Sequence, residues 1–205
     1  TRGGASTAGV RSGASAAVER GGAVAPASGT SLGGTAVTIT GTGFVVGDGR
    51  HVITNHHVIP DVIDYKGRET VAVFSGRGNS AKGRAAEVVA KDVEHDLALL
   101  AIKGKPLPAL TLGSTSRVKE GKEYAFTGFP IGMVLGLYPV THQGIVSAIT
   151  PIVIPSMNAK QLTAQQIRRM RNPFDVYQLD AIAYPGNSGS PLYEIESGKV
   201  VGVVN

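Results

Sequence analysis

The stretch Gly43-Phe44-Val45-Val46-Gly47-Asp48-Gly49-Arg50-His51-Val52-Ile53-Thr54 decides the fold class. Two short apolar runs flank Gly47-Asp48-Gly49-Arg50, and an Asp-Gly pair is typical of the tight turn of a β-hairpin. Just before it, residues 36–40 alternate apolar and polar side chains with the period of two that a half-buried strand requires. We therefore predict antiparallel strands in this part of the chain.

The same pattern continues outward from this hairpin. The chain of 205 residues has 28 glycines and only 17% charged residues, which suits strands and turns better than helices. Many short strands without a fixed repeat predict an all-β barrel or sandwich. The further strand-like runs are residues 70–74, 85–90, 97–102, 123–127, 144–149, 176–179 and 199–204.

Two segments break the pattern. Residues 1–34 carry Gly, Ala, Ser or Thr at 25 of 34 positions, which leaves too little apolar surface to offset ordering entropy, so we predict a disordered linker. A long connection, about residues 151–175, contains a helix candidate that Asn172-Pro173 would stop. We expect a short helical insertion near residues 160–172. The connection could be a functional loop or a surface excursion without a role, and both interpretations stay open.

Composition narrows the function classes. The net charge is +5, but Lys and Arg are scattered apart from Arg168, Arg169 and Arg171, and no aromatic residues interleave with a basic stripe. Nucleic-acid binding is therefore not expected. The absence of cysteine excludes disulfides and Cys-based metal sites, and no cofactor is expected. No run approaches the 18 or so apolar residues of a membrane span, and no signal peptide is visible at the start.

A serine lies between glycines in the segment Pro185-Gly186-Asn187-Ser188-Gly189-Ser190-Pro191. Glycines allow positive φ angles, and consecutive backbone N–H groups in such a turn can converge on an anion. The Ser188 hydroxyl then has what acyl transfer needs, a nucleophile beside donors for a developing oxyanion. Alone the signal is weak, because Gly-Asn-Ser-Gly is also ordinary loop sequence.

A serine nucleophile needs a base and an orienting carboxylate. Candidates are Asn55-His56-His57-Val58, which follows a strand-like run, and His95-Asp96, which opens an apolar run. Taken singly, each histidine is better explained as a surface or core residue than as a catalytic one. In the same way, Asp96 alone is better explained as a turn residue at the start of a strand. Adjacent side chains in an extended segment point to opposite sides, so we expect only one of His56 and His57 to face Ser188.

Together these motifs resemble those of bacterial HtrA/Deg proteases, which are trypsin-like serine proteases. The order His, Asp, Ser is that of chymotrypsin-type triads, and the resemblance runs from about residue 41 to the end. The matching stretches are Gly41-Thr42-Gly43-Phe44-Val45-Val46 with Ile53-Thr54-Asn55-His56-His57-Val58, His95-Asp96-Leu97-Ala98-Leu99-Leu100, Phe126-Thr127-Gly128-Phe129-Pro130-Ile131-Gly132, Gly144-Ile145-Val146-Ser147, and Asp180-Ala181-Ile182-Ala183-Tyr184 leading into the Pro185 segment.

The resemblance implies a chymotrypsin-like pair of six-stranded β-barrels, at about residues 35–112 and 113–205, with the active site between them. It implies Ser188 as nucleophile, His57 as general base and Asp96 as the group that orients it. The register of the family pattern, Thr-Asn-x-His-Val, selects His57 over His56. The backbone N–H groups of Gly186 and Ser188 are implied as the oxyanion hole.

The implied activity is a serine endopeptidase acting on unfolded or flexible protein segments in protein quality control. The resemblance also implies a periplasmic or extracellular bacterial location and a homo-oligomer, a trimer in the family pattern. From a different class, a protease-fold scaffold or binding protein that has lost turnover stays as the alternative. Labelling of Ser188 by a fluorophosphonate separates the two.

Some positions depart from the family pattern. Ser190 replaces a second glycine, a form shared by some glutamyl endopeptidases, but Val204 lies near where those carry a histidine, so glutamyl specificity is not expected. The family places Ile182, Val203 and Asn205 at the substrate. An apolar residue at position 182 favours small or medium aliphatic P1 side chains, because it offers no counter-charge. The sequence holds no PDZ domain and stops at Asn205, so we expect a truncated second barrel.

Overall fold

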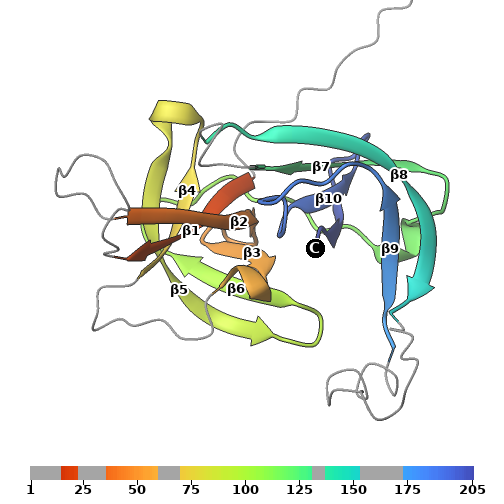
Figure 1. The fold of residues 1–205 in the computed structure, drawn as a ribbon, viewed down its shortest axis with the longest axis horizontal. Coiled ribbons are helices and arrows are strands. Elements are labelled where there is room, and N and C mark those ends of the chain that lie inside the picture. Colours follow the sequence, from red (N-terminus) through yellow and green to blue (C-terminus); the bar gives the residue numbers. More distant parts are fainter. Residues whose placement is uncertain (1–14, 23–35, 60–69, 131–136, 153–172) are drawn as a thin grey trace, which may run out of the picture.

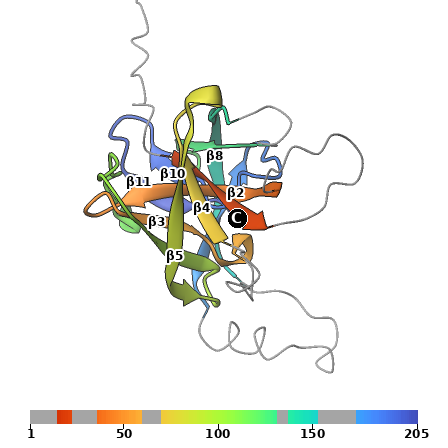
Figure 2. The same cartoon turned by 90° about the vertical axis from the view of Figure 1, so that its left-hand side faces the viewer.

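The computed structural model describes residues 15–22, 36–59, 70–130, 137–152 and 173–205. Within these ranges the regular elements are strands and three single-turn 3-10 helices, which confirms the prediction of an all-β chain. The strands form two units that lie side by side, the first from the N-terminal half of the chain and the second from the C-terminal half (Figures 1 and 2).

The first unit is a closed barrel with the strand order β1-β2-β3-β6-β5-β4. Every pair of neighbouring strands in this barrel is antiparallel, as is expected for strands joined by short connections such as hairpins. The hairpin predicted around Asp48-Gly49 joins β2 and β3, with Val45 opposite Val52. The strands are β1 (Ser15–Gly22), β2 (Ala36–Val46), β3 (His51–Asn55), β4 (Thr70–Ser75), β5 (Lys82–Asp92) and β6 (Leu97–Ile102).

Strand β1 corrects the expectation of a disordered linker over residues 1–34. Residues 15–22 pair with β2 on one side and with β4 on the other, so this strand closes the barrel. Closure satisfies the backbone N–H and C=O groups that both neighbours would otherwise leave at an open edge. The first barrel therefore begins before residue 35. The rest of the predicted linker lies outside the described residues.

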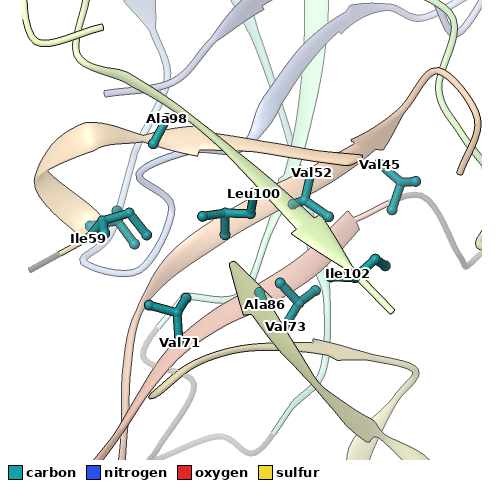
Figure 3. Packing of buried hydrophobic residues seen from close by; sticks show 10 residues of the cluster. Val45, Val52, Ile59, Val71, Val73, Ala86, Ala98, Leu100 and Ile102 are labelled. Atoms are coloured by element: carbon teal, nitrogen blue, oxygen red, sulfur yellow. The ribbon is translucent and has the colours of Figure 1, made fainter. Parts of the chain in front are cut away.

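The barrel core is filled by aliphatic side chains from alternate strand positions (Figure 3). Val52 of β3 lies opposite Val45 of β2 and Leu100 of β6, and all three are fully buried. Each such side chain contributes about 1.5–3 kcal/mol through burial. Val58 and Ile59 pack against the same core, so the chain that follows β3 is fixed to the barrel.

The second unit is an antiparallel sheet with the order β11-β10-β7-β8-β9. Within the described residues it has five strands, whereas the family resemblance implies six. Its core includes Tyr124, Phe126 and Val146, all buried. The strands are β7 (Glu123–Gly128), β8 (Val140–Pro151), β9 (Asp175–Asp180), β10 (Pro191–Glu194) and β11 (Val200–Val203).

A third apolar cluster joins the two units. Phe44 and Val46 of β2 pack with Ala125, Tyr193 and Val200 of the second sheet, and all five are buried. This shared core fixes the two units relative to each other, which a site built from both requires. The expected helical insertion near residues 160–172 lies outside the described residues. Among the described helices, none is long and apolar enough to cross a membrane.

Candidate active site

Ser188 follows a turn that its neighbours dictate. The Asn187 N–H donates to the Tyr184 carbonyl at 3.0 Å, and Gly186 has a φ of +98°. These are features of a type II turn with Pro185 and Gly186 at its centre, where proline presets the first φ and glycine permits the positive one. The turn leads to the partly buried Ser188, three residues before β10 begins.

The main chain around Ser188 packs closely against the first barrel. The Ser188 carbonyl accepts a hydrogen bond from the Thr42 N–H of β2 at 2.8 Å. A Cβ at Gly41 would lie 2.9 Å from the Ser188 carbonyl oxygen and 2.6 Å from a methyl group of Val58. Glycine at position 41 thus lets the nucleophile loop approach Val58, which is the residue after His57.

His57 and Asp96 come from the two chain segments that flank the β3–β6 pair. His57 lies in a 3-10 helix at His56–Val58, directly after β3, and Asp96 directly precedes β6. Asp96 Oδ2 is 2.6 Å from His57 Nδ1, and Asp96 Oδ1 accepts a hydrogen bond from the His57 backbone N–H at 2.9 Å. One carboxylate therefore holds both the imidazole ring and the main chain of this histidine.

Asp96 is itself held in an uncommon backbone conformation. Its φ is +55°, and it is the only non-glycine residue with a positive φ among the described residues. Aspartate tolerates this region better than most residues, and such conformations cluster at functional sites. Its carbonyl accepts hydrogen bonds from Asn55 Nδ2 at 2.9 Å and from the His56 N–H at 3.0 Å.

The expectation that His56 and His57 belong to an extended segment is wrong, because the Ile59 N–H bonds back to the His56 carbonyl and closes a 3-10 turn. The two rings still differ in their contacts. The His57 ring contacts Asp96, whereas the His56 hydrogen bonds with described residues run through its main chain.

The residues of the predicted nucleophile loop and of the His–Asp pair thus meet at the junction of the two units. Within the described residues, no hydrogen bond links the Ser188 hydroxyl to His57. Among the same residues, the backbone N–H groups of Gly186 and Ser188 have no protein acceptor. As far as the described residues go, both groups are therefore available to donate to a ligand, as an oxyanion hole requires.

The three residues that the family pattern places at the substrate are not equivalent. Ile182 is 69% exposed, although isoleucine is usually buried. Val203 and Asn205 line a cavity of about 370 Å³ between the two units, together with His95 and Asp96, and Ile182 is not among its lining residues. The cavity therefore lies beside Asp96 of the His–Asp pair.

Several polar residues of the site were not singled out by sequence reasoning. Asn55 is 2% exposed and holds the Asp96 carbonyl, and its position directly before the two histidines was the available signal. Asn187 is 1% exposed, and its Nδ2 lies 3.5 Å from His142 Nε2 on β8. Thr42 is fully buried and contacts the nucleophile loop, which no local pattern indicated.

A metal centre would need several ligating side chains close together. No group of three or more His, Cys, Asp or Glu side chains gathers within the ranges that the structure describes. The neighbouring ion pair of His95 with Asp92, 2.8 Å between Nδ1 and Oδ2, has the same chemistry as His57 with Asp96 but belongs to an exposed turn. It provides a natural comparison for the proposed site.

Comparison with known proteins gives consistent results. The family model of the trypsin-like peptidase domain matches residues 41–203. Curated relatives include probable periplasmic serine endoproteases, described as DegP-like, from Chlamydia muridarum (32% identical over 165 residues) and Marinomonas sp. (35% over 163 residues). Each match covers 80% of this chain but only 28% and 29% of the relative, so the chain spans less than a third of their length.

Solved structures show the same fold. The HtrA-type protease AlgW with a decapeptide superposes with a TM-score of 0.68 at 23% identity, over 94% of this chain and 55% of that one. Deg5 superposes with a TM-score of 0.60 at 27% identity, over 91% of this chain and 78% of that one. The likeness confirms the chymotrypsin-like double-barrel architecture. The chain belongs to the trypsin-like peptidase family, among its HtrA/Deg-like members.

Proposed function

We propose that this chain is a serine endopeptidase in which Ser188 is the nucleophile, His57 the general base and Asp96 the group that orients the base. The observation that carries the proposal is that the Asp96 carboxylate contacts His57 twice: Oδ2 lies 2.6 Å from ring Nδ1, and Oδ1 accepts a hydrogen bond from the backbone N–H at 2.9 Å. The closeness of the Ser188 main chain to Val58 brings the nucleophile loop to the same place.

The contact with Asp96 supports one tautomer of His57. A carboxylate accepts hydrogen bonds, so its contact with Nδ1 keeps a proton on that nitrogen and leaves Nε2 as the acceptor. Nε2 takes the proton of the Ser188 hydroxyl as its oxygen attacks the scissile carbonyl carbon. The imidazolium, stabilised by Asp96, then gives the proton to the leaving amine, and water repeats the sequence on the acyl-enzyme.

The N–H groups of Gly186 and Ser188 stabilise the oxyanion of the tetrahedral intermediate. Their donors are free of protein acceptors among the described residues, and the type II turn at Pro185-Gly186 fixes the backbone that carries one of them. Removing one such donor costs about 10²–10³ in kcat in a well-studied enzyme. Preorganised donors are effective because they need no reorientation as charge develops.

Substrates are unfolded or flexible protein segments. Ile182, six residues before Ser188, gives the P1 side chain an apolar partner without a counter-charge, and its 69% exposure leaves it available for contact. We expect cleavage after small or medium aliphatic residues such as Val, Ala or Leu, because burying an unpaired Lys, Arg or Glu is costly. Cleavage sites in a peptide library that cluster after Arg or Glu would contradict this preference.

The decisive experiment combines labelling and turnover. Wild-type protein is incubated with a fluorophosphonate probe and, separately, with fluorescently labelled casein. We expect a covalent label on Ser188 and casein cleavage, with both lost in Ser188→Ala and both kept in Ser147→Ala, a substitution at an exposed serine of β8. A wild-type protein that neither labels nor cleaves is instead a protease-fold scaffold.

The location follows the relatives, and the assembly follows the family resemblance. The curated relatives are named as periplasmic, and we extend a periplasmic or extracellular location to this protein. From the resemblance to HtrA/Deg proteases we also propose a homo-oligomeric state, a trimer. Cell fractionation of the native protein and sedimentation of the purified chain test the two statements. A cytosolic protein contradicts the location, and a monomer at micromolar concentration contradicts the assembly.

A further inference from the structure

We infer that Thr42 is a positioning residue of the oxyanion hole, whose hydroxyl and backbone N–H hold the main chain of Gly186 and Ser188 at a fixed place. The inference rests on the proposed function, because it assigns Thr42 a role in the same reaction. It concerns a side chain that has no hydrogen bond to the Ser188 hydroxyl, His57 or Asp96 among the described residues. Its effect would pass entirely through the two residues whose N–H groups are the oxyanion donors.

Both carbonyls of the donor residues are bonded to Thr42. The Thr42 hydroxyl donates to the Gly186 carbonyl at 2.7 Å, and the Thr42 N–H donates to the Ser188 carbonyl at 2.8 Å. Each donor residue is thus held through its own C=O group. A single residue of β2 therefore sets where both segments of the hole lie.

The remaining polar atoms of Thr42 fix Thr42 itself. Its hydroxyl oxygen accepts from the Phe129 N–H at 2.9 Å, and its carbonyl accepts from the Thr54 hydroxyl at 2.6 Å. Thr42 is fully buried, and Thr54 is fully buried on the neighbouring strand. Because every donor and acceptor of Thr42 is used, the residue cannot rotate without breaking bonds that water cannot replace.

The anchor matters because the held segment contains the most flexible residue type. Gly186 has no Cβ, and its φ of +98° is one of many conformations that glycine can adopt at little cost. The hydrogen bond from Thr42 ties the Gly186–Asn187 peptide to the closed barrel, and this peptide is joined through the Gly186 Cα to the N–H that serves as an oxyanion donor. Oxyanion stabilisation depends on donors held about 2.7–3.1 Å from the developing charge, so small displacements reduce kcat.

The test separates the contribution of the Thr42 hydroxyl from the contribution of the shape of its side chain. Thr42→Val has nearly the same shape but no hydroxyl, and Thr42→Ser keeps the hydroxyl and loses a methyl group. Tyr193→Phe is the matched control, since it also removes a buried hydroxyl, bonded to Thr127 at 2.8 Å in the second sheet. For each protein we measure kcat and KM on a fluorogenic peptide taken from a mapped casein cleavage site, together with the affinity for a peptide aldehyde of the same sequence.

We expect kcat of Thr42→Val to fall about 10- to 100-fold, less than for loss of a donor itself, with KM changed less than about twofold. Affinity for the aldehyde, which forms an oxyanion-like adduct, should fall with kcat. Thr42→Ser should keep kcat within about threefold, and Tyr193→Phe should lower the melting temperature without lowering kcat. This combination is one that a purely structural role for Thr42 would not produce.

The outcomes that overturn the two proposals differ. An inactive wild type overturns the proposed function. An active wild type in which Thr42→Val keeps its kcat, or in which Thr42→Ser loses as much as Thr42→Val, overturns the positioning role alone. If Thr42→Val does not fold, Thr42→Cys replaces it, because a thiol is a weak donor. A Thr42→Cys variant with a kcat equal to that of Thr42→Ser then overturns the inference.

Discussion

Asp96 and His57 are joined at two points, because one carboxylate oxygen contacts the imidazole and the other accepts the backbone N–H of the same residue. These two contacts fix the distance between the chain segments that carry Asp96 and His57, and they also fix the orientation of the His57 ring. The side chain of Asp96 is only 16% exposed, whereas that of His57 is 48% exposed. The carboxylate is therefore shielded while the ring stays open to a substrate.

The first prediction tests this pair. Asp96→Asn should lower kcat by about 10⁴, as in the equivalent change in a well-studied triad, because an amide no longer enforces the tautomer with a free Nε2. The matched control is Asp92→Asn, which changes the neighbouring carboxylate that bonds His95 at 2.8 Å. Casein cleavage by the control should stay within about twofold of wild type. Equal losses in both variants would show that the Asp96–His57 contact has no special role.

The second prediction separates the adjacent histidines. His57→Ala should cost several orders of magnitude in kcat, on the scale of single triad deletions, because no other ring contacts Asp96 in the described residues. His56→Ala should cost less than about tenfold, since His56 is bonded through its N–H and carbonyl, which alanine keeps. Both are read by kcat on a peptide substrate, and the reverse ranking would reassign the base to His56.

The third prediction concerns barrel closure by β1. Ala17 pairs with Thr42 of β2 and with Phe74 of β4, so Ala17→Pro removes an N–H from a strand with neighbours on both sides and should lower the free energy of unfolding by about 3 kcal/mol or more. Ala17→Ser keeps the N–H and should change it by less than about 1 kcal/mol. Urea unfolding measures both. Equal stabilities would mean that β1 does not close the barrel in solution.

Strand β1 also shows where sequence reasoning fails. Strand β6 was predicted with its correct bounds, since Leu97–Ile102 is a continuous apolar run and every second residue from Ala98 is buried. The composition of Ser15–Gly22 carries no such signal, and its place is set by partners that lie far along the chain. The sequence analysis did not predict strand β10, Pro191–Glu194, because the strand begins at the last residue of the segment that was interpreted as the loop around Ser188.

The same division holds in the site. The proposed roles of His57, Asp96 and Ser188 rest on motifs that can be recognised locally, because each chemistry requires a particular side chain. The proposed role of Thr42 could not be recognised in this way, because its hydroxyl meets Gly186 across 144 residues of sequence and any small side chain would satisfy the local strand pattern. The 3-10 turn at His56–Val58 was also missed, since three residues are too few for a periodicity.

The fourth prediction concerns acid stability. The pKa of the Glu194 carboxyl lies below its ordinary value of 4.5, chiefly because the Ser197 hydroxyl donates to it at 2.7 Å, with a further contribution from Lys122. A lowered pKa in the folded state stabilises the protein above the unfolded pKa, and this stabilisation is lost as the pH falls through the folded value. Removing the Ser197 hydroxyl should therefore lower the free energy of unfolding at neutral pH, and this effect should disappear in acid.

The test compares Ser197→Ala with wild type by urea unfolding at several pH values. We expect the variant to be less stable at pH 7, and the difference to shrink as the pH falls below the ordinary glutamate pKa of 4.5. Ser116→Ala is the control, because the Ser116 hydroxyl bonds the exposed Ser114 and no carboxylate. A stability difference for Ser197→Ala that is the same at every pH would contradict the assignment.

The fifth prediction concerns Gly189, the residue after the proposed nucleophile Ser188. Its φ is +87°, and a Cβ there would overlap the Thr42 carbonyl oxygen and lie 2.6 Å from Thr54 Oγ1. The carbonyl cannot yield, because the Thr54 hydroxyl holds it at 2.6 Å and Thr42 is bonded at every polar atom. Gly121 provides the matched comparison, because its φ is +75° and a Cβ there would have nothing within 4 Å.

Alanine at position 121 therefore incurs only the conformational cost of the left-handed region, about 1–2 kcal/mol. Alanine at position 189 incurs the same cost and also displaces main chain of β2 beside the proposed oxyanion hole, so we expect a loss of at least about 3 kcal/mol. Gly189→Ala should also lose casein cleavage under conditions where it stays folded, while Gly121→Ala keeps it. Similar free energies of unfolding for the two variants, with activity retained in both, would show that the nucleophile loop and β2 are not packed as closely as the Thr42 contacts require.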